Sequence, residues 1–255
     1  MKPFTGSDFE KRGGLVAGAG GGMGLAIANG LIDGGADIVL ADIKPEPEGI
    51  AAGPGRALYL QGDLSDEDFV GEACARAHEH AGRIDYLVNT VGVWWGGRDV
   101  SVVDIEPGVW RRVLEINLDS MMLTARHAVP MMRAGGGGAI VLISSIQALR
   151  GDAVAQDAYS ASKGAIRALS KSLAIQFAAD NIRCNSILPG YVWTEMMHRV
   201  DGEPGGRENK QNIIPLKRFD TVADIAGPSL FLLSDAASFI TGAELIIDGG
   251  TTALP

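Results

Sequence analysis

The sequence contains little cysteine and fewer basic than acidic residues. Its two cysteines, Cys74 and Cys184, lack the spacing of a metal or redox site and indicate no disulfide framework, so we expect free, buried or half-buried thiols. Lys and Arg together number 22 against 31 Asp and Glu, which gives a formal net charge of −9. This excess of negative charge argues against nucleic acid or an anionic membrane surface as a partner.

Long hydrophobic runs are also absent. No uninterrupted apolar run approaches the roughly 20 residues that cross a bilayer, and the N-terminal segment MKPFTGSDFEKRGG lacks the apolar core of a secretory signal. The histidines lack the spacing of metal ligands, so no metal is expected. We therefore expect a cytoplasmic protein whose partner is a small molecule, not a nucleic acid or a membrane.

What is present is the composition of a globular α/β protein, 46% hydrophobic and 21% charged. Short apolar runs alternate with longer amphipathic segments, a pattern that predicts strand–helix–strand units and a parallel sheet. The expected strands are Leu15–Ala17, Ile38–Ala41, Ala57–Gln61, Ile84–Asn89, Ala139–Ile143, Arg183–Leu188 and Leu245–Ile247. The expected helices run from Met23 to Gly34, Asp66 to Ala81, Glu106 to Met132, Tyr159 to about Ala179 and Thr221 to Leu233. Pro130 is expected to kink the third helix or to end it early.

No repeat and no long linker interrupts the pattern, so we expect a single domain over residues 1–255. The one break in composition is the polar segment DGEPGGRENKQ, Asp201–Gln211. It is rich in Gly and Pro, and we expect a mobile surface loop there. Together with its flanks, from about residue 193 to 215, this loop is a candidate substrate lid.

A glycine-rich turn follows the first expected strand and precedes the first expected helix. It contains Gly18, Gly22, Met23 and Gly24, and glycines there let the backbone approach a pyrophosphate that faces the helix N-terminus. A dinucleotide site also needs an acid about 20 residues further on. Asp42 is that acid, at the end of the second strand. A carboxylate there accepts hydrogen bonds from both adenosine ribose hydroxyls and repels a 2′-phosphate, so NAD is favoured over NADP.

Tyr159 and Lys163 lie four residues apart, on one face of an expected helix. A phenol has an ordinary pKa of about 10. A neighbouring cation favours the phenolate and makes the tyrosine a usable proton donor or acceptor near neutrality. By itself the spacing is also typical of a solvated helix face.

Taken together, these motifs resemble the single-domain branch of the short-chain dehydrogenase/reductase family. Its T-G-x-x-x-G-x-G turn is matched except that Ala17 replaces the threonine, and its N-N-A-G segment appears as Asn89-Thr90-Val91-Gly92. The segment from Pro189 to Thr194 resembles the family's P-G-x-V-x-T segment around the nicotinamide. The resemblance implies a doubly wound Rossmann-type fold, with a seven-stranded parallel sheet in the order 3-2-1-4-5-6-7 and helices on both faces. It also implies a homotetramer, assembled through the two longest helices.

The resemblance further implies which residues bind the cofactor and which catalyse. The cofactor-binding residues are Gly18, Gly22, Met23, Gly24, Asp42, Asp63, Leu64, Asn89, Gly92, Tyr159, Lys163, Pro189, Gly190, Val192 and Thr194. Tyr159 is then the general acid or base, and Lys163 lowers its pKa and binds the nicotinamide ribose. Ser145, with Ser144 as its competitor, donates a hydrogen bond to the reacting oxygen, and Asn117 holds a water that relays the proton.

Aromatic and long polar side chains follow the strand ends where ligands bind in such a sheet. The expected substrate pocket comprises Trp94, Trp95, Gln147, Tyr191, Trp193 and Met196. It suits a hydrophobic secondary alcohol or ketone, including cyclic and aromatic ones. The tryptophans are equally compatible with core or subunit packing. Nothing in the sequence resembles a carboxylate clamp, although Arg98, Arg150 and Arg199 are available to form one.

We therefore predict an NAD-dependent oxidoreductase that interconverts such an alcohol and its ketone by hydride transfer. One alternative is a reductase of 3-oxoacyl groups on carrier protein or CoA, which usually prefers NADP. Another is a non-catalytic NAD-binding protein, against which the intact set Asn117, Ser145, Tyr159 and Lys163 argues. Sugar-nucleotide epimerases share the Y-x-x-x-K pair but are typically longer.

Overall fold

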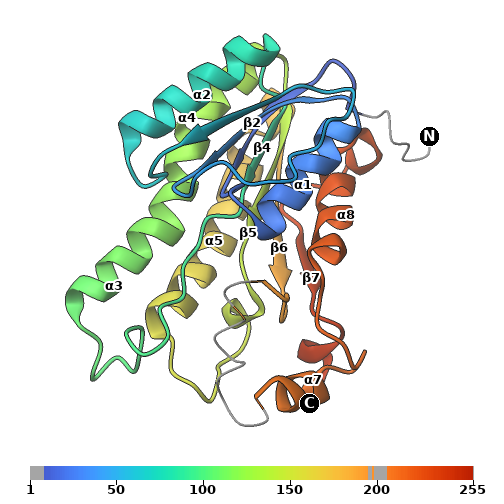
Figure 1. Ribbon diagram of the computed structural model, residues 1–255. Helices are drawn as coiled ribbons and strands as arrows, with labels where there is room; N and C mark the ends of the chain where they lie inside the picture. The colour runs from blue at the N-terminus through green and yellow to red at the C-terminus, as the bar shows by residue number, and fades with distance from the viewer. Residues whose placement is uncertain (1–8, 195–196, 198–205, 255) are drawn as a thin grey trace.

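The computed structural model describes residues 9–194, 197 and 206–254. In this part of the chain, seven strands form one sheet in the order β3-β2-β1-β4-β5-β6-β7 (Figure 1). Every neighbouring pair in it is parallel. The strands are β1 Gly13–Ala17, β2 Asp37–Asp42, β3 Ala57–Gln61, β4 Tyr86–Asn89, β5 Gly138–Ile143, β6 Ile182–Pro189 and β7 Glu244–Ile247. The predicted order is confirmed, and it reverses between β1 and β4, which makes their carboxyl ends the switch point where ligands bind.

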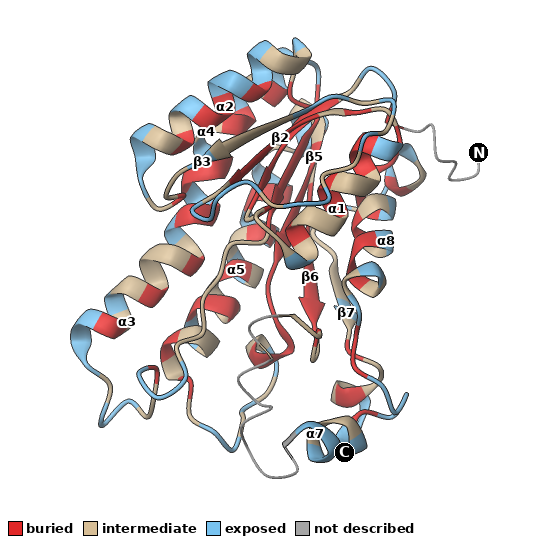
Figure 2. Cartoon of the chain, viewed as in Figure 1, coloured by how far each residue is buried: buried red, intermediate tan, exposed pale blue. Residues whose placement is uncertain are grey.

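Helices cover both faces of the sheet. They are α1 Gly22–Asp33, α2 Glu67–Ala81, α3 Pro107–Leu114, α4 Ser120–Ala134, α5 Asp157–Gln176, α7 Gly206–Ile213 and α8 Val222–Leu233. α1 and α8 pack on one face, with α2, α4 and α5 on the other (Figure 1). Successive strand residues therefore enter different cores: Leu15 belongs to the core under α2, α4 and α5, and Val16 to the core under α1 and α8. Because both faces are covered, the central strands are buried almost throughout (Figure 2).

Side-chain caps set several helix boundaries close to their predicted positions. Asp66 accepts a hydrogen bond from the Asp68 N–H at the start of α2, and α2 ends at Gly82 in a left-handed conformation. Thr221 and Asp224 form a capping box at the start of α8. Both free thiols, Cys74 and Cys184, are buried as expected.

The helix predicted from Glu106 to Met132 is interrupted differently from our expectation. A π-helical turn, Glu115–Asp119, separates α3 from α4. Of the two outcomes expected for Pro130, a kink or an early end of the helix, the early end is wrong, because α4 continues to Ala134. Val129 and Met132, on either side of the proline, are buried in the core, and this packing holds the last turn in place.

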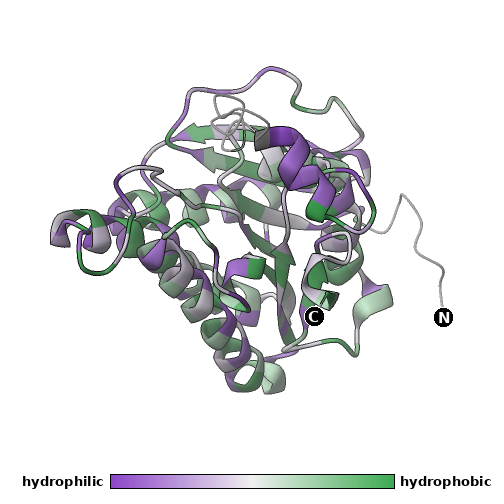
Figure 3. Ribbon diagram, turned by 90° about the horizontal axis from the view of Figure 1, so that it is seen from below, coloured by the Kyte–Doolittle hydropathy of each residue, from purple (hydrophilic) through white to green (hydrophobic). Residues whose placement is uncertain are grey.

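The polar segment predicted as a loop is partly helical. Residues 206–211 form the first part of α7, which is the strongly hydrophilic helix in front of the sheet's carboxyl edge in Figure 3. The Arg207 guanidinium lies 4.1 Å from the Trp193 ring centroid and the Lys210 ammonium 5.5 Å from that of Tyr191. These cation–π contacts, which local composition does not reveal, attach α7 to the rest of the protein. Residues 201–205 lie outside the described part of the chain.

No helix that the structure describes is long and apolar enough to cross a bilayer. Within the same residues, no group of three or more His, Cys, Asp or Glu side chains is placed to hold a metal ion.

Candidate active site

The glycine-rich turn borders a cleft of about 620 Å³ at the carboxyl ends of β1 and β2. Gly18 has a φ of +84°, and its N–H donates to the Ala41 carbonyl over 2.8 Å. A side chain at Gly24 would collide with the Gly18 carbonyl oxygen, so glycine there lets α1 begin directly against the turn. The turn therefore offers a backbone cradle at a helix N-terminus, which suits the pyrophosphate of a dinucleotide.

Most of the predicted cofactor-binding residues line this cleft or the cavity next to it. Those lining the cleft are Gly18, Gly22, Met23, Gly24, Asp42, Asp63, Leu64, Gly92 and Thr194. Pro189, Gly190, Val192, Tyr159 and Lys163 line the neighbouring cavity instead. The cleft and the cavity meet, since Met23, Thr90, Gly92 and Thr194 border both.

Asn89 lines neither space. It is fully buried, and its amide donates to the Ser120 carbonyl over 3.1 Å and to Thr124 Oγ1 over 3.0 Å. Its Oδ1 accepts the Val91 N–H over 2.9 Å. Asn89 thus connects the end of β4 to α4 by hydrogen bonds and supports the cleft without lining it.

Asp42 is held at the rim of the cleft by backbone groups. Its Oδ2 accepts the Gly20 N–H over 2.8 Å, and its Oδ1 accepts the Lys44 N–H over 3.0 Å. Two cations absent from our sequence predictions, Lys44 and Arg112, line the same cleft. Arg112 is engaged by the Asp63 carboxylate at 2.8 Å and by Glu115 at 3.0 Å.

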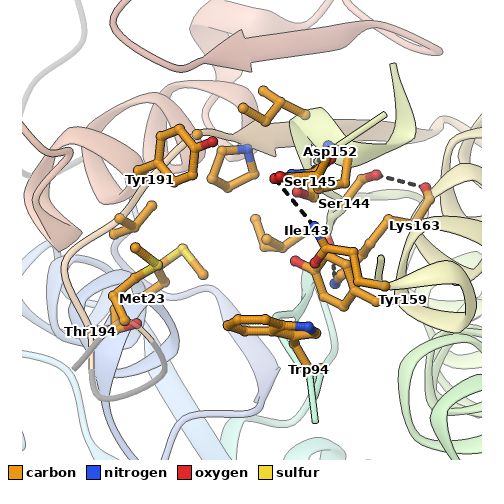
Figure 4. A pocket seen from close by; sticks show the side chains of 18 of the residues that line it. Met23, Trp94, Ile143, Ser144, Ser145, Asp152, Tyr159, Lys163, Tyr191 and Thr194 are labelled. Atoms are coloured by element: carbon orange, nitrogen blue, oxygen red, sulfur yellow. Dashed lines mark hydrogen bonds between the residues drawn. The ribbon is translucent and has the colours of Figure 1, made fainter. Parts of the chain in front are cut away.

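The predicted catalytic residues meet where the cavity reaches the cleft. Figure 4 shows Ser145, Tyr159 and Lys163 on one side of the cavity and Met23, Thr194 and Tyr191 on the other. Ser145 and Tyr159 line the same cavity, and Ser145 lowers the pKa of the Tyr159 phenol. The Lys163 ammonium lies 5.6 Å from the centroid of the Tyr159 ring and donates to the Ile143 carbonyl over 3.0 Å.

The two adjacent serines have different partners. Ser144 Oγ donates to the backbone carbonyl of Lys163 over 2.7 Å and so joins β5 to α5. Ser145 Oγ accepts the Gln147 N–H over 3.2 Å, and Ser145 lowers the pKa of Tyr159. Ser144 is thus engaged by the backbone of α5, whereas Ser145 is the serine that interacts with the tyrosine.

Burial shifts both titratable groups of the pair. It raises the pKa of Tyr159 above its ordinary value, and the hydrogen bond from Ser145 opposes this change. It lowers the pKa of the Lys163 ammonium to about 8. Lys163 is predicted to lower the pKa of Tyr159 through its positive charge. That effect therefore requires the protonated form of Lys163.

Asn117 lies in the π-helical turn between α3 and α4, a geometry frequent at functional sites. Its Oδ1 accepts the Val93 N–H over 2.7 Å, and its amide donates to the Val93 carbonyl and to Ser162 Oγ, both over 3.0 Å. Both ends of the amide thus bond to the protein. The proton-relaying water assigned to Asn117 remains a prediction, and one that this side-chain geometry does not favour.

A buried acid that the sequence did not reveal positions Tyr159. Asp99 is 1% exposed, and its carboxylate accepts the N–H groups of Ala158 and Tyr159 over 3.0 and 2.8 Å. It thereby satisfies two of the unpaired donors in the first turn of α5. Asp99 precedes Tyr159 by 60 residues, so no local motif signals this contact.

The cavity beside Tyr159, of about 210 Å³, is lined by part of the residue set predicted to bind the substrate. Trp94, Gln147 and Tyr191 line it. Trp95 lines the cofactor cleft instead, with the Arg98 guanidinium 5.0 Å from its ring centroid. Trp193 borders neither space and packs on Phe219, with ring centroids 5.0 Å apart. Met196 lies outside the described residues.

Three polar residues of this cavity were missed by sequence reasoning: Asp152, Gln156 and Lys210. Asp152 and Gln156 lie between Ser145 and Tyr159 in the chain, and this position was the one feature of the sequence that could have indicated their place in the cavity. Lys210 comes from α7 and is half-buried. The segment was expected to be a loop and, with its flanks, a candidate lid over the substrate, but its helical form and the place of Lys210 in the cavity were not predicted.

Comparison with known proteins identifies the family. A family model described as enoyl-(acyl carrier protein) reductase matches residues 18–252. The chain is 37% identical over 255 residues to a cis-4-hydroxycyclohexanecarboxylate dehydrogenase of Sinomonas cyclohexanicum, covering 98% of this chain and 100% of that protein. It is 39% identical to the trans-4-hydroxycyclohexanecarboxylate dehydrogenase of the same organism, over 94% of this chain and 92% of that one.

Further similarities extend to other dehydrogenases and to solved structures. An NAD-dependent glycerol dehydrogenase of Listeria innocua is 36% identical, over 93% of this chain and 92% of that one. The structure of a short-chain type dehydrogenase/reductase from Mycobacterium ulcerans superposes with a TM-score of 0.90 at 31% identity, covering 96% of this chain and 91% of that one. Levodione reductase superposes with a TM-score of 0.89 at 30% identity, covering 97% and 100%.

The chain belongs to the short-chain dehydrogenase/reductase family. It is an oxidoreductase that acts on CH–OH and C=O groups with a nicotinamide cofactor. The backbone cradle at Gly18–Gly24 and the acid at Asp42 fit such a cofactor.

Proposed function

We propose that the protein interconverts a cyclic secondary alcohol and its ketone with NAD. One observation carries this proposal: Ser145, Tyr159 and Lys163 cluster where an apolar, aromatic-lined cavity opens into the dinucleotide cleft. A substrate in the cavity would present its carbinol to both the catalytic hydroxyls and the cofactor.

Each catalytic side chain has a distinct task in this proposal. The nicotinamide cofactor, when bound, would accept hydride from the alcohol or return it to the ketone. Tyr159 removes the proton from the carbinol oxygen in oxidation and returns it in reduction. Ser145 donates a hydrogen bond to that oxygen as charge develops on it. Lys163, when protonated, favours the phenolate form of Tyr159.

The preference for NAD rests on Asp42. Its carboxylate is fixed at the rim of the cleft by the Gly20 and Lys44 N–H groups. A 2′-phosphate placed there would face this negative charge, and like charges in contact cost several kcal/mol. Arg112, the guanidinium in the same cleft, is already engaged by Asp63 and Glu115.

A cyclic substrate is supported by the cavity walls and by the relatives. Trp94, Tyr191, Met23 and Met197 provide flat and flexible apolar surfaces. Two relatives are named as dehydrogenases of hydroxycyclohexanecarboxylates. We further propose that Lys210, which lines this cavity together with Lys163, would pair with a carboxylate on such a ring.

Cytoplasmic location, a single domain, a lid at about residues 193–215 and a homotetramer remain predictions. The tetramer was expected to assemble through the two longest predicted helices. Three apolar residues of these helices, Met121, Leu123 and Leu173, are instead buried within the chain. Ile175 on α5, 80% exposed, is available instead. Size-exclusion chromatography with light scattering measures the assembly directly.

The test is steady-state turnover of NAD and NADP with cyclohexanol, the 4-hydroxycyclohexanecarboxylates, their ketones and a 3-oxoacyl thioester. We expect NAD-dependent turnover of the cyclic alcohols, and its loss in Tyr159→Phe while NAD still binds. Turnover of the thioester alone would favour the 3-oxoacyl reductase. NAD binding without turnover of any substrate would favour a non-catalytic protein, and retained activity in Tyr159→Phe would overturn the mechanism.

A further inference from the structure

Gln147 is a polar side chain in the mainly apolar wall of the substrate cavity. It lies in the short 3₁₀ turn Ile146–Ala148 and is 9% exposed. Its backbone N–H donates to Ser145 Oγ over 3.2 Å, so the residue is attached to the serine that faces the reacting oxygen. Its side chain lines the cavity together with that of Tyr159.

Asp152 determines which end of the Gln147 amide faces the cavity. The Gln147 Nε2 donates to Asp152 Oδ2 over 2.8 Å. An ionised carboxylate only accepts hydrogen bonds, so the reverse orientation would bring two acceptors together. Asp152 is itself held by the Val154 N–H at 3.2 Å and by the Gln156 amide at 3.5 Å. The carboxylate thus keeps the NH₂ group of Gln147 turned toward itself.

The other end of the amide has no protein partner. Within the described part of the chain, Gln147 Oε1 is buried and receives no hydrogen bond. Leaving a buried acceptor unsatisfied costs about 1–3 kcal/mol, a penalty that a donor in the cavity would remove. Because the Oε1 atom can only accept, its complement is a group that carries a hydrogen, such as a hydroxyl.

We propose that Gln147 Oε1 accepts a hydrogen bond from a second hydroxyl of the substrate, near the carbinol that reacts. The enzyme then prefers cyclic diols to the corresponding monoalcohols. This inference rests on the proposed function and specifies its substrate class. Only the reacting carbinol is oxidised: its hydride goes to the cofactor and its proton to Tyr159. The second hydroxyl is unchanged, so it keeps its bond to Gln147 in both the alcohol and the hydroxyketone.

The first measurement is the ratio of kcat/KM for cyclohexane-1,2- and -1,3-diols to that for cyclohexanol. We expect a ratio of about tenfold or more for the better diol, since one satisfied hydrogen bond of about 1.4 kcal/mol corresponds to a factor of ten. In Gln147→Met, of similar length but without the acceptor, the ratio should fall toward one. In Asp152→Asn the amide is no longer forced into one orientation, and the ratio should fall part of the way.

Gln176→Met is the matched control. It makes the same change at an exposed glutamine of α5, outside the cavity, whose amide donates to Ser172 Oγ. It should therefore retain the wild-type ratio. A wild-type ratio near one for both diols, or a ratio that survives Gln147→Met, would overturn the inference. Thermal denaturation of each variant separates a local effect from loss of the fold.

Binding distinguishes failure of this inference from failure of the proposed function. Calorimetry on the NAD complex of Tyr159→Phe compares diol with cyclohexanol without any turnover. Tighter binding of a diol, lost in Tyr159→Phe combined with Gln147→Met, supports the role of Gln147 even if no substrate is turned over. Equal binding of the diols and cyclohexanol refutes it, whatever the activity.

Discussion

The Thr90 hydroxyl donates to the Gly18 carbonyl oxygen over 2.9 Å and to the Ala17 carbonyl oxygen over 3.2 Å. It thereby joins the end of β4 to the glycine-rich turn. Gly18 matches the family pattern, whereas Ala17 and Thr90 depart from it: the family has threonine at the position of Ala17 and asparagine at that of Thr90. The turn lacks the threonine hydroxyl of the family at Ala17, and the hydroxyl of Thr90, directly after β4, bonds to the turn instead.

Thr90→Val should therefore weaken the cofactor site. The change keeps the shape of the side chain but removes the hydroxyl donor of the Gly18 carbonyl, while the Ala17 carbonyl keeps the backbone N–H of residue 90. We therefore expect a loss of about 1 kcal/mol in stability and weaker NAD binding by up to about tenfold. Thr90→Ser keeps the hydroxyl and should behave like the wild type. Calorimetric NAD titration and urea denaturation measure the two effects. Equal NAD affinity in both variants would exclude this role of Thr90.

The two serines at the end of β5 should differ in their effects. Ser145→Ala removes the hydrogen bond to the reacting oxygen, and we expect kcat to fall by about 10²–10³-fold. Ser144→Ala breaks only the bond to the Lys163 carbonyl, so we expect a loss of about 1 kcal/mol in stability and a much smaller change in kcat. Steady-state kinetics with cyclohexanol checks this. Equal losses of kcat would mean that the two roles are not separated.

The buried Lys163 should make the stability of the cofactor-free protein depend on pH. Its pKa is about 8 in the folded protein and ordinarily 10.5, so the unfolded chain binds the proton more tightly. Burying the charged form therefore costs stability below about pH 8, and this cost is relieved as the pH rises toward 10.5. Between pH 7 and 9 the wild type should gain about 1.4 kcal/mol relative to Lys163→Met, the equivalent of one pKa unit. Urea denaturation of both proteins tests this, and parallel pH profiles would contradict it.

Asp42→Asn should shift the cofactor preference toward NADP. The amide oxygen still accepts the Gly20 N–H, but the negative charge is gone, so we expect kcat/KM for NADP to rise about 10- to 100-fold relative to NAD. Glu46→Gln is the control, because it removes one negative charge from the exposed segment that follows β2, outside the cleft. It should leave the NAD-to-NADP ratio close to that of the wild type. An unchanged ratio in Asp42→Asn would remove the argument for NAD.

Lys210→Met tests recognition of a substrate carboxylate. The Lys210 ammonium lines the substrate cavity and lies over the Tyr191 ring. Its loss should raise the KM for 4-hydroxycyclohexanecarboxylates relative to that for cyclohexanol by about tenfold, as expected for one partly desolvated ion pair. Arg207→Met removes a cation from the same helix that stacks on Trp193 instead, and should not change this ratio. A ratio unaffected by Lys210→Met would show that the carboxylate, if bound, is held elsewhere.

Much of the fold was determined by local features of the sequence. Hydrophobic runs placed all seven strands, and Ala57–Gln61 was predicted with its observed bounds. The strand predictions are confirmed because strand periodicity and turn chemistry act over neighbouring residues. The glycine-rich turn and Asp42 line the cleft, and Tyr159 and Lys163 line the cavity, while their roles in cofactor binding and reaction remain predictions.

Tertiary structure alone decided which distant side chains meet. Asp99 caps the helix of Tyr159 across 60 residues, Asn89 is turned into the core, and Trp95 faces the cofactor cleft while Trp94 faces the substrate cavity. Cation–π contacts attach the polar helix α7, and with it Lys210, to the sheet's carboxyl edge. Local periodicity carries no information on such contacts, since each depends on how separate elements pack. The sequence by itself therefore determined the family, the sheet and the candidate reaction centre, whereas the packing of loops and α7 decided which polar groups line the cavity beside it.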